Sequence, residues 1–122
     1  MSEREFTVDE ANSLLSSLRP ALERIREARQ VVLSGGERIT KTAGLNGGGK
    51  HGREYWEALQ TLRRDVEALV QQGIVLRDPE TGLIDFPARR DGREVFLCWR
   101  LGEDHVGYWH GPETGFAGRK PL

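Results

Sequence analysis

Two stretches of the chain repeat apolar residues at alternating steps of three and four, the period of a helix with one buried face. The first opens at Thr7-Val8-Asp9-Glu10, where the Thr7 and Glu10 side chains are spaced to cap the first free amides of a helix. Pro20 lies inside this stretch and is expected to kink it, and Gly35 with Gly36 is its expected end. The apolar positions of this stretch are Ala11, Leu14, Leu18, Ala21, Ile25, Ala28 and Val32.

The second helical stretch starts near Arg53, and Gly73 is its natural C-terminal cap. Because its period matches that of the first stretch, the simplest arrangement is an antiparallel, coiled-coil-like helical hairpin over residues 7–73. We expect residues 34–52, which are rich in glycine, to form the flexible tip of that hairpin. The apolar positions of the second stretch are Tyr55, Trp56, Leu59, Leu62, Val66, Leu69 and Val70.

After Gly73 the period changes to the strict alternation of β-strands. Turn residues at Asp78–Gly82, Asp91-Gly92 and Gly102–His105 divide residues 74–110 into an antiparallel meander of three or four strands. Residues 111–122 are mostly turn formers and are expected to be irregular. The pattern therefore predicts one α+β domain over residues 1–122, with the helical hairpin packed on the meander.

The turns also predict how the strands pair. A two-residue turn at Asp91-Gly92 places Ala88 opposite Val95, Phe86 opposite Leu97 and Ile84 opposite Trp99. A four-residue loop at Gly102–His105 places Trp99 opposite Tyr108 and Leu97 opposite His110. The face expected to pack on the hairpin then carries Ile84, Phe86, Val95, Leu97, Trp99, Leu101, Val106 and Tyr108.

The opposite face of the meander carries the candidate site. Asp85 is expected to lie across from Cys98 and diagonal to Arg100, with Trp109 on the other side of Cys98. A carboxylate, a thiol, a guanidinium and an indole on one surface could bind a small anion or a peptide. The alternative is an Asp-Arg ion pair on a half-covered sheet, with Cys98 acting as a small apolar side chain.

His110 raises the question of a metal site. In the register above, His110 and Glu103 lie at opposite ends of the last strand, about 15–20 Å apart. Asp85 projects to the other face, and no cysteine and histidine spacing is typical of zinc binding. We therefore expect no metal site and no cofactor.

Bulk composition narrows the class of protein. Charged residues make up 30% of the 122 residues and the mean hydropathy is −0.57, so no membrane span is expected. The net charge of −1 argues against general binding to nucleic acid. Cys98 is the only cysteine and the MSEREF start lacks an apolar signal segment, so we expect a cytoplasmic protein.

The stretch GLNGGGKH, Gly44 to His51, resembles a phosphate-binding loop in which His51 replaces the Ser or Thr that would hold magnesium. Such a loop joins a buried strand to a helix. The preceding Glu37–Ala43 is too polar for a buried strand. We therefore interpret the stretch as a connection.

Four segments together resemble a small bacterial family, the domain-of-unknown-function 2203 family. They are FTVDEANSLLSSLRP, GLIDFPARRDGREVFLCWRLGE, VGYWH and GFAGRKPL. Ser16 departs from the family pattern, which has a proline there, and residues 35–52 look like an insertion. The resemblance implies no activity, substrate or cofactor. It implies that a function would lie at the residues that match the motif: Asp85, Cys98, Trp99, Arg100, Glu103, Trp109, His110 and Arg119.

The sequence is compatible with two functions. The first is a non-catalytic cytoplasmic interaction module that forms a homodimer through the helical hairpin, whose apolar stripes are wider than one seam requires. The second is a binding protein or an enzyme that takes a small molecule or an anion on the face carrying Asp85, Arg100 and Trp109.

Overall fold

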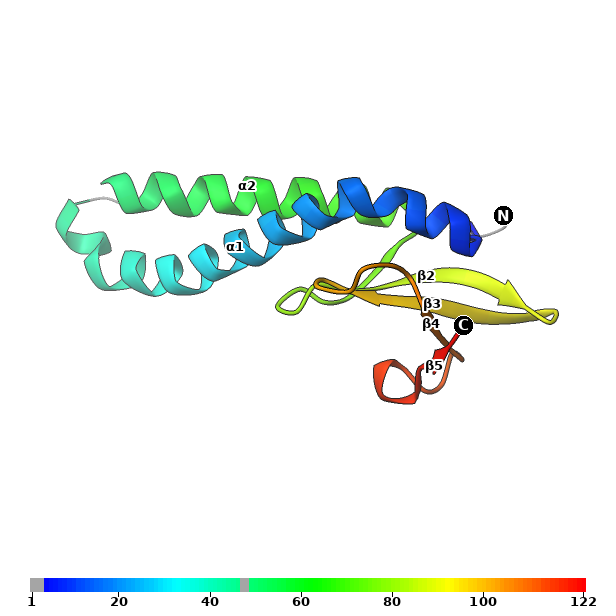
Figure 1. Ribbon diagram of the computed structural model, residues 1–122. Coiled ribbons are helices and arrows are strands. Elements are labelled where there is room, and N and C mark those ends of the chain that lie inside the picture. Colours follow the sequence, from blue (N-terminus) through cyan, green and yellow to red (C-terminus); the bar gives the residue numbers. More distant parts are fainter. Residues whose placement is uncertain (1–3, 47–48) are drawn as a thin grey trace.

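The computed structural model describes residues 4–46 and 49–122 (Figure 1). Side chains are described for all of these residues except those between 36 and 51. Two long helices pack against each other and against one antiparallel sheet, which confirms the α+β class. The helices are α1 (Val8–Asn46) and α2 (Gly49–Gln72), and a short 3-10 helix, η1, covers Phe116–Gly118. The strands, in spatial order, are β1 (Val75–Asp78), β2 (Leu83–Arg90), β3 (Arg93–Arg100), β4 (Tyr108–His110) and β5 (Lys120–Pro121).

The local signals at the helix ends are confirmed. The Glu10 amide donates to Thr7 Oγ1 at 3.1 Å, and the Thr7 amide donates to Glu10 Oε1 at 2.8 Å, which is the capping box. Gly73 adopts φ 84°, and the Gly73 and Ile74 amides donate back to Val70 and Leu69 carbonyls. This Schellman pattern ends α2 and turns the chain toward the sheet.

The expected end of the first helix at Gly35 and Gly36 is wrong, because α1 continues to Asn46. A glycine inside a helix costs about 1 kcal/mol relative to alanine, which weakens a helix without ending it. Residues 34–46 are therefore helix, as are residues 49–52, where a flexible tip was expected. The Gly44–His51 stretch lies partly outside the described residues, and its side chains lie outside them altogether.

The sheet has five strands where three or four were expected. The additional strand comes from the C-terminal segment predicted to be irregular: β5 pairs with β4, placing Tyr108 opposite Pro121 and Trp109 opposite Lys120. A two-residue strand contains no alternation that a sequence pattern could reveal.

The register of β2 and β3 is confirmed at all three predicted pairs, Ala88 with Val95, Phe86 with Leu97 and Ile84 with Trp99. The predicted register of β3 and β4 is wrong by one residue. Cys98 lies opposite Tyr108, Leu97 opposite Trp109 and Phe96 opposite His110. A shift of one residue moves every side chain of β4 to the other face of the sheet.

The core lies between the helices and one face of the sheet. Its strand residues, all buried, are Ile84, Phe86, Ala88, Val95, Leu97 and Trp99. All of them except Ala88 were expected on the face that packs on the hairpin. The helices contribute mainly Leu15, Leu18, Leu22, Ile25 and Leu69. The sheet covers only one part of the hairpin, and the end where α1 finishes and α2 begins extends beyond the strands (Figure 1). No helix among the described residues has the length and apolar character needed to cross a bilayer.

Gly82 provides a test of the packing at the β1–β2 turn. It has φ 72°, and a Cβ there would lie 2.5 Å from Leu101 Cδ1. Gly92, in the β2–β3 turn, has φ 77° and open space around the same position. We expect Gly92→Ala to cost about 1–2 kcal/mol of unfolding free energy from backbone strain alone. Gly82→Ala should cost about 1–3 kcal/mol more, because Leu101 must also move. Urea denaturation of both variants measures the difference, and equal losses would contradict the close contact with Leu101.

Candidate functional site

Three side chains of different chemistry meet on the face of the sheet opposite the helices. Asp85 comes from β2, Cys98 from β3 and His110 from β4, so three neighbouring strands each supply one group. One ligand-type atom from each lies within 4.8 Å of the other two. The residues are only 1%, 1% and 2% exposed, respectively. A carboxylate, a thiol and an imidazole are therefore concentrated in one buried cluster, which we call the Asp85–Cys98–His110 cluster.

Asp85 has an uneven set of partners. Arg77 Nε donates to Asp85 Oδ2 at 2.7 Å, and His110 Nε2 lies 2.8 Å from the same oxygen. The other oxygen, Oδ1, is buried and has no hydrogen-bond partner among the described residues. Burying a carboxylate oxygen without a hydrogen bond costs folding free energy. The Asp85 carboxylate can therefore accept one more partner at Oδ1.

Arg77 is a member of this site that sequence reasoning missed, since Arg100 was expected to pair with Asp85. It lies on β1, two residues after Val75, which is opposite Asp85, so its side chain is on the Asp85 face. A predicted register between β1 and β2 would have placed Arg77 on the Asp85 face. A bulge in that pairing, between Leu76 and Asp78, makes the register hard to derive from turn length.

His110 is held in a defined orientation. Its Nδ1 lies 2.7 Å from the Gly111 carbonyl oxygen, and its ring stacks on Phe96 with ring centres 5.5 Å apart. A carbonyl can only accept a hydrogen bond, so Nδ1 carries a proton and donates it. Nε2 therefore points at the Asp85 carboxylate.

The Cys98 thiol is not suited to nucleophilic chemistry. Burial, together with the nearby charge of Asp85, raises the pKa of Cys98 to about 11. The thiolate is the reactive species, so a thiol with this pKa is almost fully protonated and inert at neutral pH. The cluster can hold a proton or a cation between its ligand atoms, but it does not resemble an activated cysteine.

Arg119 and Glu103 lie beside the cluster and form an ion pair with two contacts, at 3.1 and 2.6 Å. Arg119 Nη1 also lies 3.9 Å from Cys98 Sγ. Although burial acts against it, the hydrogen bonds from Arg119 and the Arg100 amide hold the pKa of Glu103 below its ordinary value. The hydrogen bond to Glu103 raises the pKa of Arg119. This pair therefore stays charged and flanks the thiol.

The structure does not bring Arg100 and Trp109 to the cluster. The Arg100 side chain is exposed and lies over the ring of Phe116, at 5.1 Å, with no ion pair among the described residues. Trp109 is on the core-side face, because β4 is shifted by one residue from the expected register. The expected placement of Asp85 across from Cys98 and diagonal to Arg100 is confirmed. The expected Asp85–Arg100 ion pair and the presence of Trp109 on this face are wrong.

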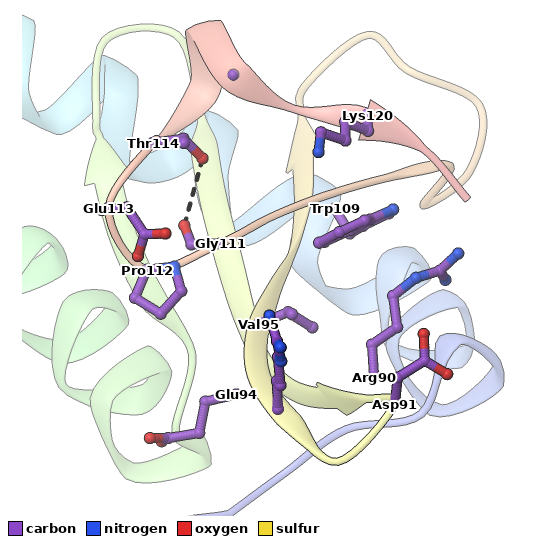
Figure 2. A pocket seen from close by; sticks show the side chains of 12 residues that line it. Arg90, Asp91, Glu94, Val95, Trp109, Gly111, Pro112, Glu113, Thr114 and Lys120 are labelled. Atoms are coloured by element: carbon purple, nitrogen blue, oxygen red, sulfur yellow. Dashed lines mark hydrogen bonds between the residues drawn. The ribbon is translucent and has the colours of Figure 1, made fainter.

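Trp109 instead borders an open pocket of about 700 Å³ at the end of the sheet (Figure 2). Its ring lies between the Arg90 guanidinium at 4.8 Å and the Lys120 amine at 5.3 Å. Acidic and basic residues line this pocket in equal number, so its charge does not select an anion. The charged lining residues are Arg90, Asp91, Arg93, Glu94, Glu113 and Lys120.

The observed register also removes the reason for excluding a metal site. Asp85 was expected to project away from His110, whereas the two side chains are 2.8 Å apart. Glu103, the other carboxylate considered for His110, pairs with Arg119 instead. The residues that the sequence motif singled out thus divide into the cluster, the flanking Arg119–Glu103 pair, the separate Arg100 and Trp109, and Trp99, which is buried in the core.

The chain belongs to the family described as an uncharacterized conserved protein family, DUF2203, whose model matches residues 4–122. Comparison with curated proteins and with solved structures gave no match.

The Arg119–Glu103 pair and Arg100 offer a matched comparison. Side-chain exposures of 14% and 18% mean that the Arg119–Glu103 pair is poorly screened by solvent. We expect Arg119→Met to lower the free energy of unfolding by about 2 kcal/mol, because it leaves Glu103 without its charged partner. Arg100→Met should change it by less than about 0.5 kcal/mol, because that side chain is exposed.

Chemical denaturation of both variants beside the unchanged chain measures these effects. If Arg100→Met lowers the free energy of unfolding as much as Arg119→Met or more, the ion pair does not stabilise this face of the sheet.

Proposed function

We propose that this DUF2203 protein is a non-catalytic cytoplasmic interaction module that forms a homodimer through the distal half of its hairpin. The distal half is defined as residues 26–35 of α1 and 52–60 of α2. In this proposal two copies pair their distal halves about a two-fold axis, giving a four-helix arrangement.

The observation that carries the proposal is that the buried residues of the distal half are small, whereas several of its large apolar residues are exposed. Within the distal half, the buried positions are small, namely Ala28, Gly35 and Ala58, and the larger Val32, Tyr55 and Leu59 are only partly buried. The large apolar side chains of Leu33 and Trp56 are 59% and 61% exposed, and Val31 is 37% exposed. An isolated hairpin that placed its large apolar residues between its helices would be more stable alone, so these side chains support a further partner.

The fold leaves this region without another layer. The core that joins helices and sheet includes α1 up to Ile25 and α2 from Leu62 onward. Beyond those residues the hairpin extends past the strands (Figure 1). The sheet therefore does not cover Leu33 and Trp56, and a second molecule is needed to remove them from water.

Charge favours a second copy of this chain as the partner. The distal half contains three arginines, Arg26, Arg29 and Arg53, and three glutamates, Glu27, Glu54 and Glu57. A surface with equal numbers of both signs has no net charge that would repel its copy. A strongly basic or acidic partner would gain little from such a surface.

The non-catalytic part of the proposal is supported by the raised pKa of Cys98, about 11, which keeps the thiol protonated in the metal-free chain. The cytoplasmic part rests on the single cysteine, which can form no disulfide within the chain.

Multi-angle light scattering at tens of micromolar tests the proposal. The unchanged chain should have twice the 13.8 kDa mass of one chain. Trp56→Glu should return it to the mass of one chain, because a charge buried in the contact costs several kcal/mol.

Val70→Glu is the matched control. Val70 is 68% exposed, more than Trp56, but lies outside the distal half near the end of α2. This variant should keep the doubled mass. A single-chain mass for the unchanged protein would refute the proposal, and loss of the dimer in Val70→Glu but not in Trp56→Glu would place the contact elsewhere.

A further inference from the structure

We propose that the Asp85–Cys98–His110 cluster binds one Zn²⁺ ion, with one oxygen, one sulfur and one nitrogen as its protein ligands. The site lies on the face of the sheet opposite the helices and is independent of the distal half of the hairpin. Three observations support it: the orientation of His110, the unpaired oxygen of Asp85 and the combination of ligand atoms.

The orientation of His110 requires a positive charge beside Nε2. Nδ1 donates its proton to the Gly111 carbonyl at 2.7 Å, which leaves Nε2 of the neutral ring with a bare lone pair. That lone pair is 2.8 Å from a carboxylate oxygen of Asp85, and two such groups repel each other unless a proton or a metal ion lies with them. A histidine that donates one nitrogen to a backbone carbonyl and presents the other to a metal is the usual arrangement in metal sites.

Asp85 provides the second observation. It is 1% exposed, its Oδ2 already contacts Arg77 and His110, and its Oδ1 has no hydrogen-bond partner among the described residues. If a proton on His110 were all that the cluster needed, the weakly donating Cys98 thiol would be the one further donor near this carboxylate among the described residues. A metal ion satisfies this oxygen as well as the imidazole.

The ligand atoms select the class of metal. Magnesium and calcium take oxygen ligands, whereas a thiolate together with an imidazole favours zinc and related transition metals. Zinc bonds of about 2.0–2.3 Å place tetrahedral ligands about 3.3–3.7 Å apart. The atoms here lie within 4.8 Å of one another, so side-chain adjustments of about 1 Å bring them to bonding distance. Three protein ligands leave one tetrahedral position open.

Binding balances charge and protons within the site. The Cys98 thiol loses its proton to solvent, as does any proton held between His110 and Asp85, and the two anionic ligands then neutralise the ion. Arg119, 3.9 Å from Cys98 Sγ, keeps its own charge paired with Glu103. Arg77 remains hydrogen-bonded to Asp85 Oδ2 and holds that carboxylate in place.

Cobalt absorption spectroscopy provides the test, because Cys98 is the only source of a thiolate. The chain, without an affinity tag and treated with a chelator, is titrated with Co²⁺. We expect saturation at one ion per chain, with tetrahedral visible bands and a near-ultraviolet sulfur-to-cobalt band. Both should disappear when Zn²⁺ is added.

Two variants distinguish this site from binding elsewhere on the chain. Cys98→Ala should lose the sulfur-to-cobalt band and weaken cobalt binding at least tenfold. His105→Ala, which changes an exposed histidine outside the cluster, should leave both unchanged. Circular dichroism melting confirms that each variant is folded.

A folded, unchanged chain that gives no tetrahedral cobalt spectrum would overturn the proposal, whatever the variants do. Cobalt binding of equal strength in Cys98→Ala would also overturn it. A monomeric but zinc-binding chain would contradict the homodimer alone, so the two proposals fail separately.

Discussion

The pairing of β2 with β3 determines where both the core and the polar cluster lie. Successive side chains of a strand point to opposite faces, so the buried neighbours Asp85 and Phe86 are separated by the thickness of the sheet. Phe86, Leu97 and the residues in line with them face the helices. Asp85 and Cys98 are opposite each other and must face away. A buried carboxylate on this second face requires partners, which β1 and β4 then supply through Arg77 and His110.

The interactions predicted successfully are those formed over a short length of chain. The Thr7–Glu10 capping box and the Gly73 cap each depend on fewer than two helical turns. The β2–β3 register depends on a two-residue turn, Asp91-Gly92, in which both residues have positive φ. In each case the residue types and their spacing leave few alternatives.

The β3–β4 connection could not be predicted in the same way. The chain leaves β3 after Arg100 and enters β4 at Tyr108, a longer connection than the four residues assumed. Glu103 shapes it, because its carboxylate accepts from the Arg100 amide and its carbonyl accepts from the Trp99 indole. Turn propensities contain no information about these side-chain contacts. The resulting error of one residue separated His110 from Asp85, so the cluster itself was missed although each of its members had been identified.

The distal half of the hairpin and the polar cluster share no residue, and they lie in different parts of the fold (Figure 1). The first is an exposed apolar surface whose neighbours carry balanced charge. The second is a sealed group of polar atoms stabilised by Arg77 and flanked by Arg119 and Glu103. We infer that association with a second copy and metal binding are separate properties of one small domain. Metal binding would also stabilise the sheet, because its ligands come from three adjacent strands.

The most direct test of this account is X-ray absorption at the zinc edge, on the chain loaded with one equivalent of Zn²⁺. The proposed site predicts one sulfur ligand at about 2.3 Å and the remaining ligands, nitrogen and oxygen, at about 2.0–2.2 Å. It also predicts the outer-shell scattering of a single imidazole ring. A first shell without sulfur, or one with several imidazoles, would contradict the assignment of zinc to Asp85, Cys98 and His110.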